Sequence, residues 1–159
     1  MDKKLFHNLI DVLDKTIKAY TQLKVLFEEK RDLLKSANPD DLGITDNKIM
    51  SLNNQIKQLN KSRTELALKI CGEDVNMSGF VEIAEIKAPE FVEPLNERKV
   101  KICKLVPELT LLNNQNVELL KHGIIMTNKM LETVIDAFAP QGCNYNGAGK
   151  TDSHDYDVW

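Results

Sequence analysis

The chain of 159 residues has few residues that interrupt helices, with only seven glycines and five prolines. None of these lies between Met1 and Asn38, and none lies between Ile44 and Cys71. A β protein needs a turn about every ten residues, and turns usually contain these residue types. The two long gaps therefore exclude strands joined by tight turns in these segments and predict long helices.

Surplus charge, long apolar runs and a set of pairing cysteines are also lacking. The net charge of −3 gives no polyelectrolyte attraction to nucleic acid or to an anionic membrane. No segment approaches the roughly 18 apolar residues of a membrane span, and the acidic N-terminus lacks a signal-peptide core. The cysteines, Cys71, Cys103 and Cys143, are odd in number and widely spaced, which indicates a reducing compartment. We expect a cytoplasmic protein with no disulfide, no nucleic-acid partner and no membrane insertion.

Arrangements typical of catalysis, nucleotide binding or metal binding are missing as well. Residues Gly147–Thr151 end like a phosphate-binding loop, but the first glycine of that motif would stand at Asn144. The histidines, His7, His122 and His154, are far apart and make no helical pair with a cysteine or another histidine. We therefore expect no enzyme activity, no metal and no cofactor.

Two helices are predicted before residue 72. The first runs from about Asp2 to Ser36, because apolar residues at heptad spacing form two adjacent rows. One row is Phe6, Leu13, Tyr20, Phe27 and Leu34, and the other is Leu5, Val12, Ala19, Leu26 and Leu33. Residues 38–43 are predicted to form a turn, either irregular or with one short helical turn, and Thr45 or Asp46 is predicted to cap the helix that follows.

The second helix has apolar residues alternately three and four apart from Ile49 to Ile70. Arg63 is the exception in this seam. For Arg63 we favour a packed aliphatic stem whose charge reaches water over a functional role. Gly72 is the expected C-cap of this helix.

A third long helix is predicted to begin between Pro89 and Pro94 and to continue to about Ala139. Pro107 lies inside it, so we expect a kink or a break near residue 104. Asn116 falls on the apolar seam and is predicted to be a core amide that fixes register. The preceding segment, residues 71–90, fits either two turns of helix or a packed loop.

These elements predict an all-α fold: an elongated up-down helical bundle of three long helices with coiled-coil-like packing. Residues 1–139 would form one domain. Residues 140–159 are rich in glycine and aspartate and would form a mobile C-terminal tail. The tail carries Tyr145, Tyr156 and Trp159, so it is either simply solvated or a docking peptide.

The segment before the tail has an unusually wide apolar face. Its members are Ile124, Ile125, Met126, Met130, Leu131, Val134, Ile135 and Phe138. Burial of this face among the other helices is one interpretation, and composition favours it. The other is an exposed surface that accepts an amphipathic helix of another protein, since methionines suit adaptable binding surfaces.

The chain resembles the FlgN family of flagellar export chaperones over residues 5–150. The first helix carries Tyr20-Thr21-Gln22-Leu23 followed by Glu28-Glu29, and the late helix carries Asn113-Asn114-Gln115-Asn116-Val117-Glu118-Leu119-Leu120. A Tyr-x-x-x-Gly motif follows as Tyr145-Asn146-Gly147-Ala148-Gly149, with Asn146 at a position that is often glycine in the family. The length and the all-helical layout are similar to the family as well.

The resemblance implies a chaperone that binds the hook-filament junction proteins FlgK and FlgL and delivers them to the export gate protein FlhA. It implies a cargo site on the face between Ile124 and Phe138, and export-gate docking through Tyr145 and Gly149 of the Tyr-x-x-x-Gly motif. The alternative is a homodimeric coiled-coil adaptor or scaffold with no export role. Self-association into a homodimer stays open in either case. A scaffold needs only narrow seams, whereas the two adjacent rows of the first helix favour a multi-helix bundle.

Overall fold

The structure is a computed structural model that describes residues 2–36 and 39–121. These residues form four α-helices, α1 (Asp2–Ser36), α2 (Pro39–Cys71), α3 (Met77–Lys87) and α4 (Val92–Lys121), with a short 3-10 helix, η1 (Pro89–Phe91), before α4. The predicted all-α fold with three long helices is confirmed for this part of the chain. The predicted helix count omitted α3.

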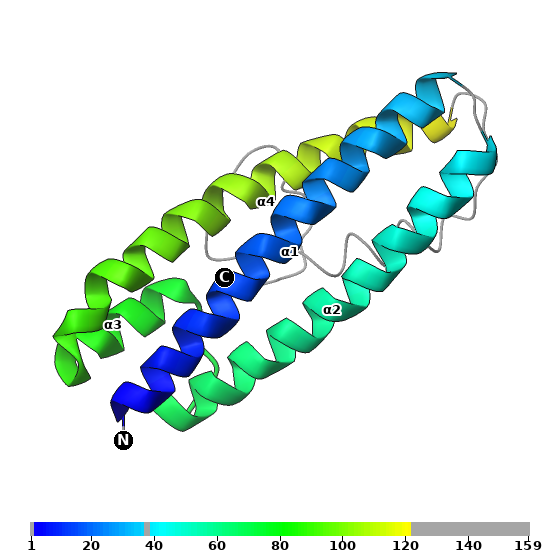
Figure 1. The fold of residues 1–159 in the computed structure, drawn as a ribbon. Helices are drawn as coiled ribbons and strands as arrows, with labels where there is room; N and C mark the ends of the chain where they lie inside the picture. The colour runs from blue at the N-terminus through cyan, green and yellow to red at the C-terminus, as the bar shows by residue number, and fades with distance from the viewer. Residues whose placement is uncertain (1, 37–38, 122–159) are drawn as a thin grey trace.

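The three long helices lie side by side, and α3 packs across one end of them (Figure 1). α2 returns antiparallel to α1, while α4 runs parallel to α1 (Figure 1). Two ion pairs between α1 and α4 agree with this parallel arrangement. Asp14 of α1 pairs with Arg98 of α4, and Lys24, further along α1, pairs with Glu108, further along α4. α1 contacts both α2 and α4 along its length, whereas α2 and α4 barely touch within the described residues.

The two apolar rows of α1 explain its central position. Every member of the row from Phe6 to Leu34 is buried, and the adjacent row is buried at Ala19 and half-buried elsewhere. Full burial of one such side chain stabilises the fold by about 1.5–3 kcal/mol. One helix therefore packs against two neighbours, as in a multi-helix bundle, and this differs in detail from the coiled-coil-like packing that we predicted.

The predicted turn at residues 38–43 is wrong, because α2 already begins at Pro39. Proline suits the first position of a helix, where its missing N–H would have no intrahelical partner. Asp40 and Asp41 follow in the first turn, where negative charge interacts favourably with the helix dipole. Thr45 and Asp46 are buried within the helix and do not cap it.

The C-terminal end of α2 confirms the predicted cap. α2 ends at Cys71, and Gly72 has a φ of 82°, a left-handed conformation that glycine adopts without the steric cost of a Cβ. The N–H of Gly72 donates to the carbonyl of Leu68 at 3.0 Å. The chain then turns toward α3, whose first turn is capped by the Asn76 side chain accepting from the N–H of Gly79 at 3.0 Å.

The preferred interpretation of Arg63 is wrong, because its charge does not reach water. The side chain is fully buried, and its guanidinium donates to the carbonyl of Val75 at 3.0 Å and to Asp74 at 3.4 Å. Burial lowers the pKa of Arg63 from its ordinary value, and Asp74 offsets part of that shift. The guanidinium thus ties the α2–α3 connection to the body of α2.

Of the alternatives for residues 71–90, helix is correct, and α3 is longer than two turns. The start of the third long helix is confirmed, since η1 and α4 begin at Pro89 and Val92. Of the two alternatives for Pro107, the break is wrong, because α4 continues through Pro107 to Lys121, and the kink stays a prediction. Residues 122–139 of that predicted helix, and the tail from 140 to 159, lie outside the described residues.

Candidate functional site

In the described part of the chain, no group of three or more His, Cys, Asp or Glu side chains is placed to hold a metal ion. The described helices include none that is long and apolar enough to cross a membrane.

The residues predicted to bind cargo or the export gate fall outside the described residues. They are Ile124, Ile125, Met126, Met130, Leu131, Val134, Ile135 and Phe138 for cargo, and Tyr145 and Gly149 for the gate. The last residue of α4 that the structure describes is Lys121, three positions before Ile124 in the sequence.

Each of the two motifs that carry the resemblance in the described helices contributes residues to the core. Tyr20 and Leu23 of the first motif are fully buried, as is Asn116 of the second. The Nδ2 of Asn116 donates to the main-chain carbonyl of Phe27 at 3.1 Å, which joins α4 to α1. The predicted core position of Asn116 is confirmed, and its contact fixes the register of the two parallel helices.

A buried ion pair joins α1 to α2 at the same end of the bundle. Lys30 Nζ lies 2.6 Å from Asp46 Oδ1, and both side chains are 2% exposed. Sequence reasoning missed this pair because it assigned Asp46 to a cap. The available signal was spacing, since Lys30 stands seven residues after the core residue Leu23 and three after Phe27.

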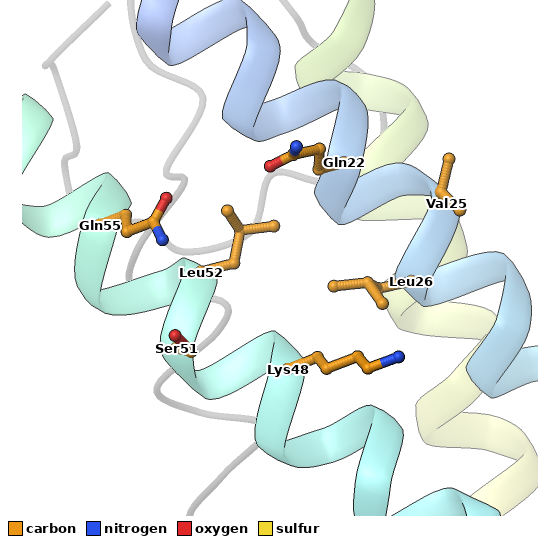
Figure 2. A pocket seen from close by; sticks show the side chains of 7 residues that line it. All are labelled: Gln22, Val25, Leu26, Lys48, Ser51, Leu52 and Gln55. Carbon is orange, nitrogen blue, oxygen red and sulfur yellow. The ribbon is translucent and has the colours of Figure 1, made fainter.

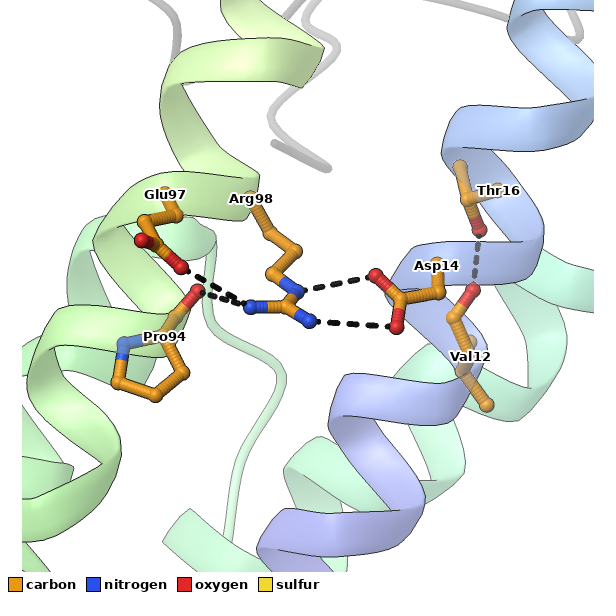
Figure 3. Close-up of polar contacts among 6 residues, drawn as sticks. All are labelled: Val12, Asp14, Thr16, Pro94, Glu97 and Arg98. Carbon is orange, nitrogen blue, oxygen red and sulfur yellow. Dashed lines mark hydrogen bonds and ion pairs between the residues drawn. The ribbon is translucent and has the colours of Figure 1, made fainter.

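Near the opposite end, Arg98 of α4 holds α1 through a forked contact with Asp14 (Figure 3). Its Nε and Nη2 atoms donate to the two carboxylate oxygens of Asp14 at 2.9 and 3.3 Å. Its Nη1 atom donates to the Pro94 carbonyl and to Glu97, each at 3.3 Å. These hydrogen bonds with Asp14 raise the pKa of Arg98 above its ordinary value. Two-point contacts of this kind fix geometry as well as adding stability.

The outer surface between α1 and α2 is hollowed. Leu26 of α1 and Leu52 of α2 point toward each other there, and Gln22 and Gln55 flank them (Figure 2). Lys48 extends from α2 toward Leu26 (Figure 2). Further hollows adjoin this one on both sides and share Gln22, Gln55 or Lys48 with it. We call the whole feature the α1–α2 groove.

Comparison with known proteins gives one finding that covers nearly the whole chain. A family model described as FlgN protein matches residues 1–153. The match includes all of α1 to α4 and also the segment that holds the predicted cargo and gate residues. No curated protein and no solved structure matches the chain.

Proposed function

Because the chain belongs to the FlgN family of flagellar export chaperones, we propose that it binds the hook-filament junction proteins FlgK and FlgL in the bacterial cytoplasm. It would keep them from assembling early and deliver them to the export gate protein FlhA. The observation that carries the proposal is the family match over residues 1–153. A role of this kind requires no catalytic group, only surfaces that bind and release.

The proposed cargo site is the apolar face from Ile124 to Phe138. Its sequence supplies a stripe of aliphatic side chains together with Met126 and Met130, which suits a surface that takes up an amphipathic helix. A cargo segment that is unfolded before binding must be ordered on the chaperone, and this ordering reduces the affinity. Moderate affinity fits a chaperone that has to release its cargo.

The test is a pull-down with the full chain as bait and purified FlgK or FlgL as prey. We expect the wild-type chain to retain both proteins. The double variant Ile124→Asp/Met130→Asp places two charges in the proposed apolar contact, and we expect it to weaken retention at least about a hundredfold, because central interface residues often contribute 2 kcal/mol or more each.

A matched control separates loss of the site from a general effect of added charge. Val100 is a 67% exposed apolar residue on α4, far from the proposed face in sequence, so Val100→Asp should leave retention unchanged. Circular dichroism of each variant should show an unchanged helical spectrum. If the wild-type chain retains neither FlgK nor FlgL, the proposed function is wrong. If the double variant still binds, cargo lies elsewhere.

A further inference from the structure

The α1–α2 groove is long and continuous. Its central hollow shares Gln22 and Gln55 with the hollow on one side and Lys48 with the hollow on the other. Along α1 the lining extends from Lys15 to Leu33. At 1.5 Å per helical residue this distance is about 27 Å, the length of a helix of roughly 18 residues.

Apolar side chains line the groove and remain open to solvent. Val25 is 50% exposed and Ile44 is 56% exposed, although both are large apolar residues on otherwise amphipathic helices. The half-buried Leu26 and Leu33 and the buried Leu52 also line the groove. Exposed apolar side chains gathered in one groove of a folded domain often mark a contact surface.

Charge is distributed unevenly along the groove. One end is lined by Lys15 and Lys18, and the other by Glu29, Asp32 and Asp41 together with Lys48. Lys15 pairs with Asp11 and Asp32 pairs with Arg31, so Lys18 and Glu29 carry the difference between the two ends. A partner that follows the groove would be bound most favourably when its own charges are arranged in the opposite order. The two charged ends therefore specify a register as well as a surface.

The shape of the surface distinguishes between two kinds of occupant. In a symmetric dimer formed through the groove, each chain would contribute the same surface to the interface. The hollow of one chain would then face the hollow of the other, and neither would be filled. A single helix, by contrast, presents a convex ridge that fills a hollow between two helices. The concave shape thus favours one helix over a second copy.

We propose that the α1–α2 groove binds an amphipathic helix of a partner protein. The helix has an acidic side chain at the end against Lys18 and a basic side chain at the end against Glu29. Its apolar stripe covers Val25, Leu26 and Ile44. This site uses none of the residues proposed to bind FlgK, FlgL or FlhA.

The test uses two synthetic peptides of about 18 residues with leucines at heptad spacing. In the first, glutamates occupy one half and lysines the other. The second has the same composition with the two charges interleaved. By fluorescence anisotropy at low salt, we expect the full chain to bind the first peptide about tenfold more tightly, and we expect this preference to shrink as salt screens the charges.

Variants of the chain test whether the first peptide binds in the α1–α2 groove. Val25→Asp should weaken binding of the first peptide at least about tenfold, because it places a charge in the apolar stripe. Leu111→Asp is the matched control, since Leu111 is a 60% exposed apolar residue on α4. Exchange of one charge at each end, Lys18→Glu with Glu29→Lys, keeps the net charge and should remove most of the preference between the two peptides.

Three results would overturn the proposal. One is equal affinity for the two peptides at low salt. Another is unchanged binding by the Val25→Asp chain. The third is a self-associating chain that sediments as a monomer only after Val25→Asp, which would assign the groove to a second copy. Because no junction protein is present in the assay, failure here is distinct from failure of the proposed export function.

Discussion

Lys30 and Asp46 form an ion pair in which both side chains are buried, the one such pair among the residues that the structure describes. Removing two charges from water costs free energy, and their mutual attraction offsets this cost only in part. Such a pair therefore contributes little to stability compared with apolar residues of similar size. Its geometric effect is clearer, because a one-turn slip of α1 against α2 would separate the charges within the core.

Substitution of one partner and then of both tests this view. Lys30→Met leaves Asp46 buried without its counter-ion, and we expect the free energy of unfolding to fall by about 3–5 kcal/mol. Lys30→Met with Asp46→Leu removes both charges, and we expect stability close to that of the wild type. Urea denaturation followed by circular dichroism measures both. A double variant as unstable as the single one would show that the pair itself stabilises the fold.

Arg63 shows what could and could not be predicted at the residue scale. Its place in an apolar seam predicted a packed stem, and the stem is packed. The partners of its guanidinium were not predictable from helical spacing, because Val75 and Asp74 belong to the connection after α2. The path of that connection depends on how α3 packs, which the sequence of α2 does not encode.

At the scale of helices, two of the prolines misled the prediction of boundaries, although the start near Pro89 was predicted correctly. Pro39 and Pro107 both suggested interruption, yet Pro39 begins α2 and Pro107 lies inside α4. The reason is tertiary packing, since Ile102, Val106 and Leu109 on either side of Pro107 are fully buried. Their burial outweighs the hydrogen bond that the proline removes from the helix.

The same reasoning predicts that Pro107 lowers the stability of α4. Pro107→Ala restores a backbone N–H within a helix that is already continuous, and we expect the free energy of unfolding to rise by about 1–3 kcal/mol. Pro94→Ala is the control, because Pro94 lies in the first turn of α4, where a missing N–H costs little. Thermal and urea unfolding measure both variants. A destabilised Pro107→Ala chain would indicate that the ring itself is needed for packing.

At the scale of the whole molecule, α1 is the helix on which the others assemble. Its two apolar rows predicted burial on a broad face, and α1 does pack against both α2 and α4. The sequence did not predict which row meets which neighbour, since the same apolar pattern fits either arrangement of two flanking helices. The sequence also did not predict that α3 packs across one end of the long helices, because a short apolar run fits either a helix or a loop.

The proposed function assigns two partners to two segments of one chain, and this separation can be tested. Tyr145 lies seven residues beyond Phe138, the last residue of the proposed cargo face, with Pro140 and Gly142 between them. Because proline and glycine disfavour continuation of a helix, we expect Tyr145 to contact its partner independently of the cargo face. Tyr145→Ala should therefore weaken binding to FlhA at least about tenfold and change binding to FlgK less than about twofold, as measured by calorimetry with each purified partner. Tyr156→Ala is the matched control, since it removes another aromatic side chain from the same C-terminal segment outside the Tyr-x-x-x-Gly motif and should leave both affinities unchanged. If Tyr145→Ala weakens both partners equally, the two contacts are not separate, and cargo and export gate must be bound by one shared surface.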